Sequence, residues 1–154
     1  MGRDDLTRWG NCMFSASEQL RGKKILLVDD DAELARMMRL RFWMADLNCM
    51  TATHPLEAKK LIHDHKIDIV LTDHDMPHQT GIQMVQDLRS GELHKPDLIY
   101  LFSGKFSPDN LPAELGIRCC FPKPLDFDRF FHIIENDVRL PTDVELNSEM
   151  LFGL

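Results

Sequence analysis

Short apolar runs alternate along the chain with segments whose apolar residues recur at helical spacing. Residues 25–28 are apolar throughout and stop at three aspartates, as expected for a strand that is buried on both faces of a parallel sheet. Residues 98–102 are also apolar throughout, and residues 68–72 (DIVLT) are mainly apolar and β-branched. Together with two weaker runs, they predict strands at 25–28, 49–53, 68–72, 98–102 and 117–121.

The segments between these strands have helical periods. The first helix is predicted by apolar residues that recur at i, i+3, i+7 and i+10. Residues 107–115 contain Pro108 and Pro112, which limit any helix there to a turn or two. The residues that predict the helices, in chain order, are Met37, Leu40, Met44 and Leu47; Pro55 to about His65; Ile82, Val85 and Leu88; and Phe127, Phe130, Phe131 and Ile134.

Strands that alternate with helices predict an α/β fold, in which helices cover both faces of a parallel sheet. The chain has 154 residues, which suits one domain with short flanking segments. We expect an N-terminal extension at 1–22, which is polar and aperiodic, as a loose segment or a short docking helix. The domain itself is expected at 23–138, and a C-terminal tail at 139–154.

The charge balance argues against nucleic acid as a partner. The chain carries 18 Lys and Arg against 25 Asp and Glu, a net charge of −7, and no basic patch offsets it. No apolar run approaches the length that spans a bilayer, so membrane insertion is not expected. The four cysteines form no CxxC motif and are interpreted as reduced thiols of a cytoplasmic protein.

Polar residues follow the strands at the positions where parallel sheets place their active sites. The first strand runs into Asp29 and Asp30, and the third into Asp73. Ser103 follows the fourth strand, and Lys123 follows the fifth. Clustered carboxylates repel one another unless a cation joins them, and Mg²⁺ is the natural oxygen-bound dication. A carboxylate nucleophile beside a lysine and a hydroxyl suits phosphoryl transfer.

The strings ILLVDDD, IVLTDHDMP, FSG and PKP, in this order and spacing, resemble the receiver domain of response regulators over roughly residues 23–138. The resemblance implies a doubly wound five-stranded sheet of order 2-1-3-4-5. It also implies that Asp73 accepts a phosphoryl group from a histidine kinase or a histidine phosphotransfer protein. Phosphorylation would then change the affinity for a downstream protein, so the chain is expected to be a signalling switch and not an enzyme.

By the same resemblance, Asp29, Asp30 and Asp73 hold Mg²⁺, together with the backbone carbonyl of Asp75. Ser103 and Lys123 bind the phosphoryl group, Gly104 keeps the acceptor accessible, and the bond before Pro124 is cis. Lys105 is two residues after Ser103, and an ion pair between Asp75 and Lys105 over the site is a further hypothesis.

Two features depart from the family pattern. Cys120 occupies the switch position, three residues before the lysine, where the family has an aromatic residue. The fourth helix is expected to be short. These departures leave open a degenerate receiver, which would bind partners without phosphate. The string Asp73-His74-Asp75 also resembles the DxD motif of haloacid-dehalogenase-type phosphatases, although the order of the acids and the absence of a cap insertion disfavour that alternative.

Overall fold

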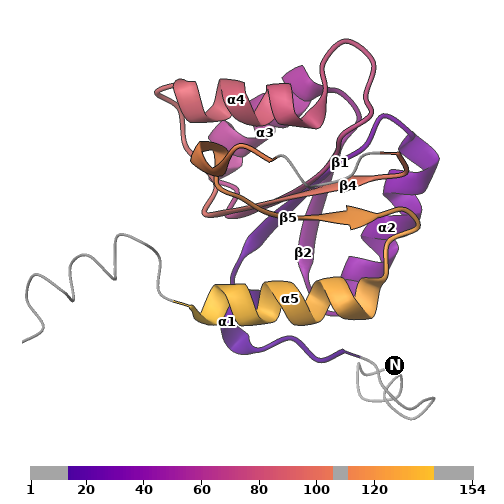
Figure 1. The fold of residues 1–154 in the computed structure, drawn as a ribbon. Coiled ribbons are helices and arrows are strands. Elements are labelled where there is room, and N and C mark those ends of the chain that lie inside the picture. The colour runs from indigo at the N-terminus through magenta and orange to yellow at the C-terminus, as the bar shows by residue number, and fades with distance from the viewer. Residues whose placement is uncertain (1–13, 106–110, 141–154) are drawn as a thin grey trace, which may run out of the picture.

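A computed structural model describes residues 14–105 and 111–140 of the chain. Its centre is an all-parallel sheet of order β2-β1-β3-β4-β5, which confirms the predicted fold and strand order (Figure 1). The five strands begin and end within one residue of their predicted bounds. They are β1 (Lys24–Val28), β2 (Asn48–Ala52), β3 (Ile69–Asp73), β4 (Leu98–Ser103) and β5 (Ile117–Pro122).

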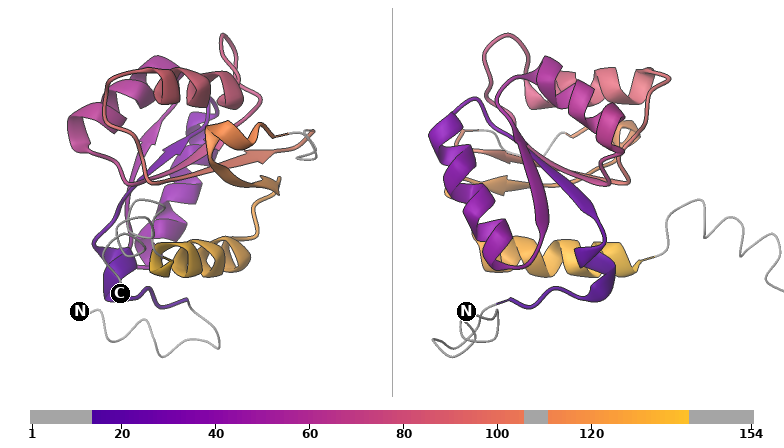
Figure 2. Two further views of the ribbon diagram at one scale, coloured as in Figure 1. Left: turned by 60° about the vertical axis from the view of Figure 1, so that its left-hand side comes forward. Right: turned by 180° about the vertical axis from the view of Figure 1, so that it is seen from behind.

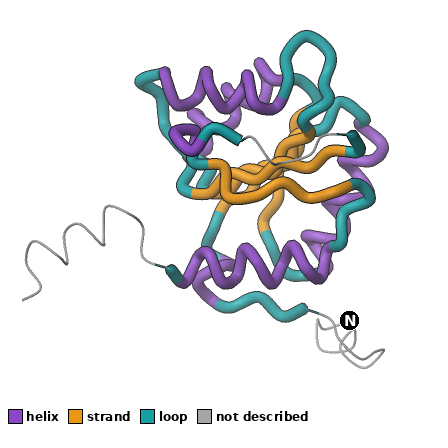
Figure 3. The backbone as a smooth tube through the Cα atoms, in the orientation of Figure 1, coloured by secondary structure: helices purple, strands orange, loops and turns teal. Residues whose placement is uncertain are grey.

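Helices cover both faces of the sheet (Figures 2 and 3). One face carries α2 (Ala32–Met44) and α5 (Phe127–Arg139), with the short α1 (Glu18–Arg21) beside α5. The other face carries α3 (Pro55–His65) and α4 (Gly81–Ser90). Each layer buries its own apolar cluster against the sheet, as a doubly wound fold requires.

Polar caps fix where the helices begin. The Asp31 carboxylate accepts the backbone N–H groups of Glu33 and Leu34, as expected of an aspartate at a helix start. Thr80 and Gln83 form a reciprocal capping box at the start of α4. These caps place the first turns of α2 and α4 next to the ends of β1 and β3, where the candidate site residues lie.

The orientation of α2 differs from what its apolar stripe suggests. An apolar stripe usually faces the core, yet Met37, Leu40 and Met44 are exposed. The buried residues are instead Ala35, Met38 and Phe42, while Leu47 is buried beyond the end of the helix. Because α2 is apolar on two sides, its period predicts a helix but not which side packs. The Phe42 ring decides the orientation, since it fits among the phenylalanines of α5.

The segment before β5 forms only a single 3₁₀ turn, η3 (Ala113–Leu115), within its described residues. This agrees with a short fourth helix, although residues 106–110 of the predicted segment lie outside the described part of the chain. Pro112 precedes the turn, and Gly116 ends it with a left-handed backbone (φ 64°). The side chain of Arg89 donates to the Leu115 carbonyl at 2.9 Å and anchors the turn on α4.

Candidate functional site

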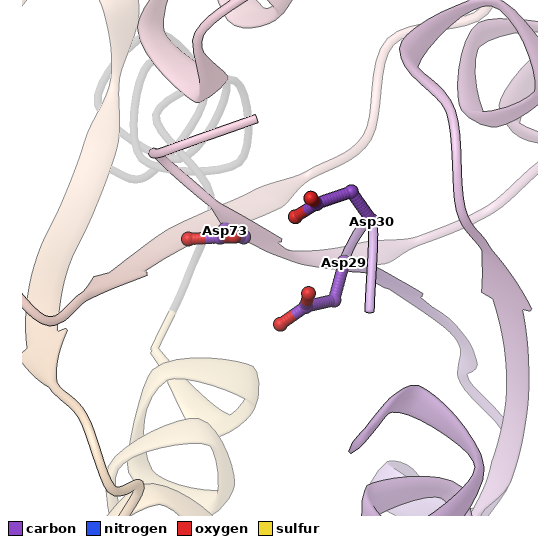
Figure 4. Close-up of side chains that lie close together, drawn as sticks. All are labelled: Asp29, Asp30 and Asp73. Atoms are coloured by element: carbon purple, nitrogen blue, oxygen red, sulfur yellow. The ribbon is translucent and has the colours of Figure 1, made fainter. Parts of the chain in front are cut away.

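Three predicted acids meet at the carboxyl end of the sheet. β1 and β3 are adjacent, with Val28 opposite Thr72, so the residues that follow these strands come together. Asp29 and Asp30 point from the end of β1 toward Asp73 (Figure 4), and one oxygen of each lies within 4.8 Å of the others. Asp29 and Asp73 are buried, whereas Asp30 is exposed. Two of the three carboxylates are therefore largely cut off from water.

Lys123 joins this cluster from the end of β5. Its Nζ lies 3.2 Å from an oxygen of Asp29 and 3.3 Å from an oxygen of Asp73, and it also sits over the Phe102 ring. Burial alone would lower the pKa of Lys123, but the two carboxylates outweigh it and raise that pKa. The peptide bond between Lys123 and Pro124 is cis, as predicted. The lysine is thus a fixed positive charge shared by two acids.

One lysine does not neutralise the acids. Burial and the nearby charge of Asp29 raise the pKa of Asp73 to about 6, against the opposing attraction of Lys123. Burial also raises the pKa of Asp29, although the backbone N–H of Asp31 donates to it at 2.9 Å. The carboxylates therefore carry negative charge that Lys123 alone does not neutralise, and a bound cation would neutralise it. The donors of the site are all carboxylate oxygens, which suit Mg²⁺ and not a metal that prefers nitrogen or sulfur.

Ser103 and Asp75 contact each other at the rim of the cluster. The Ser103 hydroxyl donates to the Asp75 carboxylate at 2.6 Å, and the backbone N–H of Lys105 donates to the Ser103 hydroxyl at 3.2 Å. The backbone N–H of Asp75 donates to the Asp73 carboxylate at 3.1 Å. In this structure the Asp75 carboxylate therefore accepts from Ser103, and the hypothesised ion pair between Asp75 and Lys105 stays a prediction.

Cys120 lies in an irregular part of β5. The register between β4 and β5 shifts by one residue, because Ile99 faces Ile117 while Leu101 faces Cys120. As a result, Ile117 packs with the α3–α4 layer, whereas Phe121 packs with the α2–α5 layer. The Cys120 thiol is half-buried, and burial together with the charge of Asp75 raises its pKa. The thiol of the predicted switch residue is therefore close enough to Asp75 for that carboxylate to raise its pKa.

Gly81 also shapes the site, although the sequence analysis did not identify it as a site residue. Its N–H donates to the His74 carbonyl at 2.9 Å, which draws the start of α4 against the end of β3. A Cβ at this position would lie 2.6 Å from the Asp73 carbonyl oxygen and 3.1 Å from the His74 Cα. Only glycine permits this approach, so it positions the backbone that carries Asp73.

Gly81→Ala is expected to lower the free energy of unfolding by about 1–3 kcal/mol, because backbone atoms must shift to admit the methyl group. Gly104→Ala is the matched control, since a Cβ there would meet nothing within 4 Å and its effect should stay within about 0.5 kcal/mol. Urea denaturation of both variants measures the difference. Equal stabilities would contradict the close packing at Gly81.

A family model, the response regulator receiver domain, matches residues 25–135. The chain belongs to the response regulator receiver family. It is 34% identical over 105 residues to the phosphate regulon transcriptional regulatory protein PhoB of Pseudomonas aeruginosa, covering 67% of this chain and 46% of that protein. It is 36% identical over 104 residues to the transcriptional regulatory protein CpxR of Escherichia coli, covering 67% of this chain and 44% of that protein. The chain spans less than half the length of these curated relatives.

Solved structures agree on the fold of this receiver. The receiver domain of the Francisella response regulator 1452 has a TM-score of 0.65 at 24% identity, covering 76% of this chain and 96% of that one. The BeF₃-activated N-terminal receiver domain of Klebsiella pneumoniae RstA has a TM-score of 0.67 at 23% identity, covering 77% and 100%. Within residues 14–105 and 111–140, no helix is long and apolar enough to cross a membrane.

Proposed function

We propose that Asp73 is the phosphoacceptor of this receiver and that Asp29, Lys123 and Ser103 assist the transfer. The observation that carries the proposal is the position of the Lys123 ammonium, which lies within 3.3 Å of an oxygen of both Asp29 and Asp73. Asp29 is a proposed metal ligand and Asp73 the proposed nucleophile. An ammonium group that contacts both can also form an ion pair with an oxygen of the phosphoryl group. Membership of the receiver family, in which phosphorylation on aspartate is standard, supports the same assignment.

The residues of this chain act by position and charge. A carboxylate oxygen of Asp73 forms a bond to phosphorus while the bond from phosphorus to the donor breaks, and the donor group takes up a proton. The N–H of Asp75 orients the attacking carboxylate through its 3.1 Å hydrogen bond. Lys123 neutralises negative charge on the transferred group, and the Ser103 hydroxyl exchanges its Asp75 partner for a phosphoryl oxygen.

Magnesium would neutralise the negative charge that Lys123 leaves on the carboxylates of the site. Asp29, Asp30 and Asp73 would hold it through carboxylate oxygens, and Asp75 through its backbone carbonyl. When bound, the ion supplies two positive charges that offset the acids and the phosphoryl oxygens.

We further propose that the phosphodonor is a histidine kinase or a histidine phosphotransfer protein, and that a downstream protein senses the phosphorylated state in the cytoplasm. Phosphorylation replaces the single negative charge of the Asp73 carboxylate by a phosphoryl group of about −1.5 to −2 charges, which biases the domain between two packings. Cys120 in place of an aromatic ring means that the movement of a large side chain at this position is not the signal. The receiver unit is proposed to span 23–138, with 1–22 and 139–154 flanking it.

Intact-mass spectrometry after incubation with a small phosphodonor and Mg²⁺ tests the proposal. The wild type should gain the mass of one phosphoryl group, and chelation of Mg²⁺ should prevent the gain. Asp73→Asn should gain nothing, whereas the exposed control Asp64→Asn should behave as the wild type.

A wild type that takes up no phosphate from any small donor, and that binds no Mg²⁺, would overturn the proposal and favour a phosphate-independent binding module. Repeated turnover of phosphate esters that depends on Asp73 would favour a phosphatase instead.

A further inference from the structure

The outer face of α2 carries an apolar patch in contact with solvent. The patch consists of four residues with large exposed fractions: Met37 (66%), Leu40 (56%), Trp43 (66%) and Met44 (47%). The spacing of Met37, Leu40 and Met44 at i, i+3 and i+7 aligns them along one side of the helix, opposite the buried Met38 and Phe42. Single exposed apolar residues are ordinary, whereas these three aligned residues and the neighbouring Trp43 together form one continuous apolar face. We call these four residues the α2 patch.

Arginines surround the α2 patch. Arg36, Arg39 and Arg41 are all exposed, and Glu33 is the one acidic residue in the helix. This helix is therefore basic within a chain of net charge −7. Two copies of α2 would bring like charges together, which disfavours a second α2 as the occupant. The charge pattern instead requires an occupant that is both apolar and acidic.

The segment 141–154 of the same chain has that composition. It lies outside the described residues, and its sequence is PTDVELNSEMLFGL. It contains three acids, Asp143, Glu145 and Glu149, and no lysine or arginine. Its large apolar residues are Val144, Leu146, Met150, Leu151, Phe152 and Leu154. Both its charge and its apolar content therefore complement the α2 patch and its arginines.

The segment is tethered within reach of α2. α5 begins against α2, where the Arg41 guanidinium lies 5.0 Å from the centroid of the Phe127 ring. α5 has 13 residues, so its far end lies roughly 20 Å from that contact at about 1.5 Å per residue. Fully extended, the residues from 141 to 154 span about 46 Å at roughly 3.3 Å each. The chain can therefore return along α5 and still cover the length of α2.

We propose that the segment 141–154 binds in cis on the outer face of α2, with its acids beside the arginines and its apolar residues on the α2 patch. Intramolecular binding of this kind is independent of protein concentration. The proposal does not depend on phosphorylation of Asp73.

The fluorescence of Trp43 can show whether the α2 patch is covered, because Trp43 lies in the patch and is one of only two tryptophans. Trp9→Phe in the full chain leaves Trp43 as the sole indole. Acrylamide, a neutral quencher, should then quench Trp43 weakly. Changing Met150, Leu151 and Phe152 to serine should raise the quenching constant several-fold, as should Glu145→Lys with Glu149→Lys. The matched control, Asn147→Ala with Ser148→Ala, should leave it unchanged.

These substitutions lie outside the domain core, and far-ultraviolet circular dichroism checks that the fold is retained. Equal quenching of Trp43 in the parent and in the serine variant would overturn the proposal. Protection of Trp43 that disappears on dilution would overturn it too, because the occupant would then come from a second copy. Protection that survives both sets of tail substitutions would assign the α2 patch to another segment.

Discussion

Phe42→Ala is expected to lower the free energy of unfolding by about 3–5 kcal/mol, the usual cost of removing a fully buried phenylalanine ring. Phe42 is 0% exposed, and its ring lies 6.2, 5.8 and 5.4 Å from the rings of Phe127, Phe130 and Phe131. Alanine would leave a cavity between α2 and α5 that these rigid rings cannot fill. The loss should appear as a lower urea midpoint with an unchanged slope.

Leu56→Ala is the matched control for this experiment. Leu56 is also a large apolar residue on a helix, but it is 67% exposed, so its truncation should change stability by at most about 0.5 kcal/mol. If the two variants lost similar stability, Phe42 would not be the residue that orients α2. The comparison therefore tests the side of α2 that faces the core.

The orientation of α2 shows where prediction from the sequence stops. The apolar runs were enough for the positions of the strands and helices, because buried parallel strands and helical periods leave distinct patterns. The strand order came from the resemblance to the receiver family, and the structure confirms it. The choice between the Met37 side and the Phe42 side depends on the rings of α5, which lie far along the chain. A helix that is apolar on two sides offers no local signal for that choice.

The site shows the same division. Asp29, Asp73 and Lys123 could be placed together from the sequence, because each follows a strand and parallel strands end at one edge. The hydrogen bond from Ser103 to Asp75 could not be predicted from the sequence, because it depends on the side-chain rotamers at the rim of the acidic cluster. The register shift in β5 also left no signal, because IRCCF is compatible with a regular strand. It nonetheless determines which layer Ile117 joins.

Asp73→Asn is expected to make the metal-free protein more stable at pH 8, by about 1–3 kcal/mol, although it removes the nucleophile. Burial and the charge of Asp29 raise the pKa of Asp73 from 3.8 to about 6 in the folded state. Between these two values the folded protein binds more protons than the unfolded chain, so stability falls as the pH rises. Above about pH 6 this loss of stability is complete. Asparagine does not ionise, so the variant does not lose stability in this way.

The gain from Asp73→Asn should therefore shrink toward zero at pH 4, where the wild-type carboxyl is protonated in the folded state. Urea denaturation at pH 4, 6 and 8 with a chelator present measures it, and Asp64→Asn, an exposed acid on α3, is the control. Added Mg²⁺ should stabilise the wild type more than Asp73→Asn, because the variant has lost a carboxylate ligand. A variant less stable than the wild type at pH 8 would mean that attraction to Lys123 outweighs repulsion from Asp29. In that case the acids would not need a dication, and the physical basis for a magnesium site would fail.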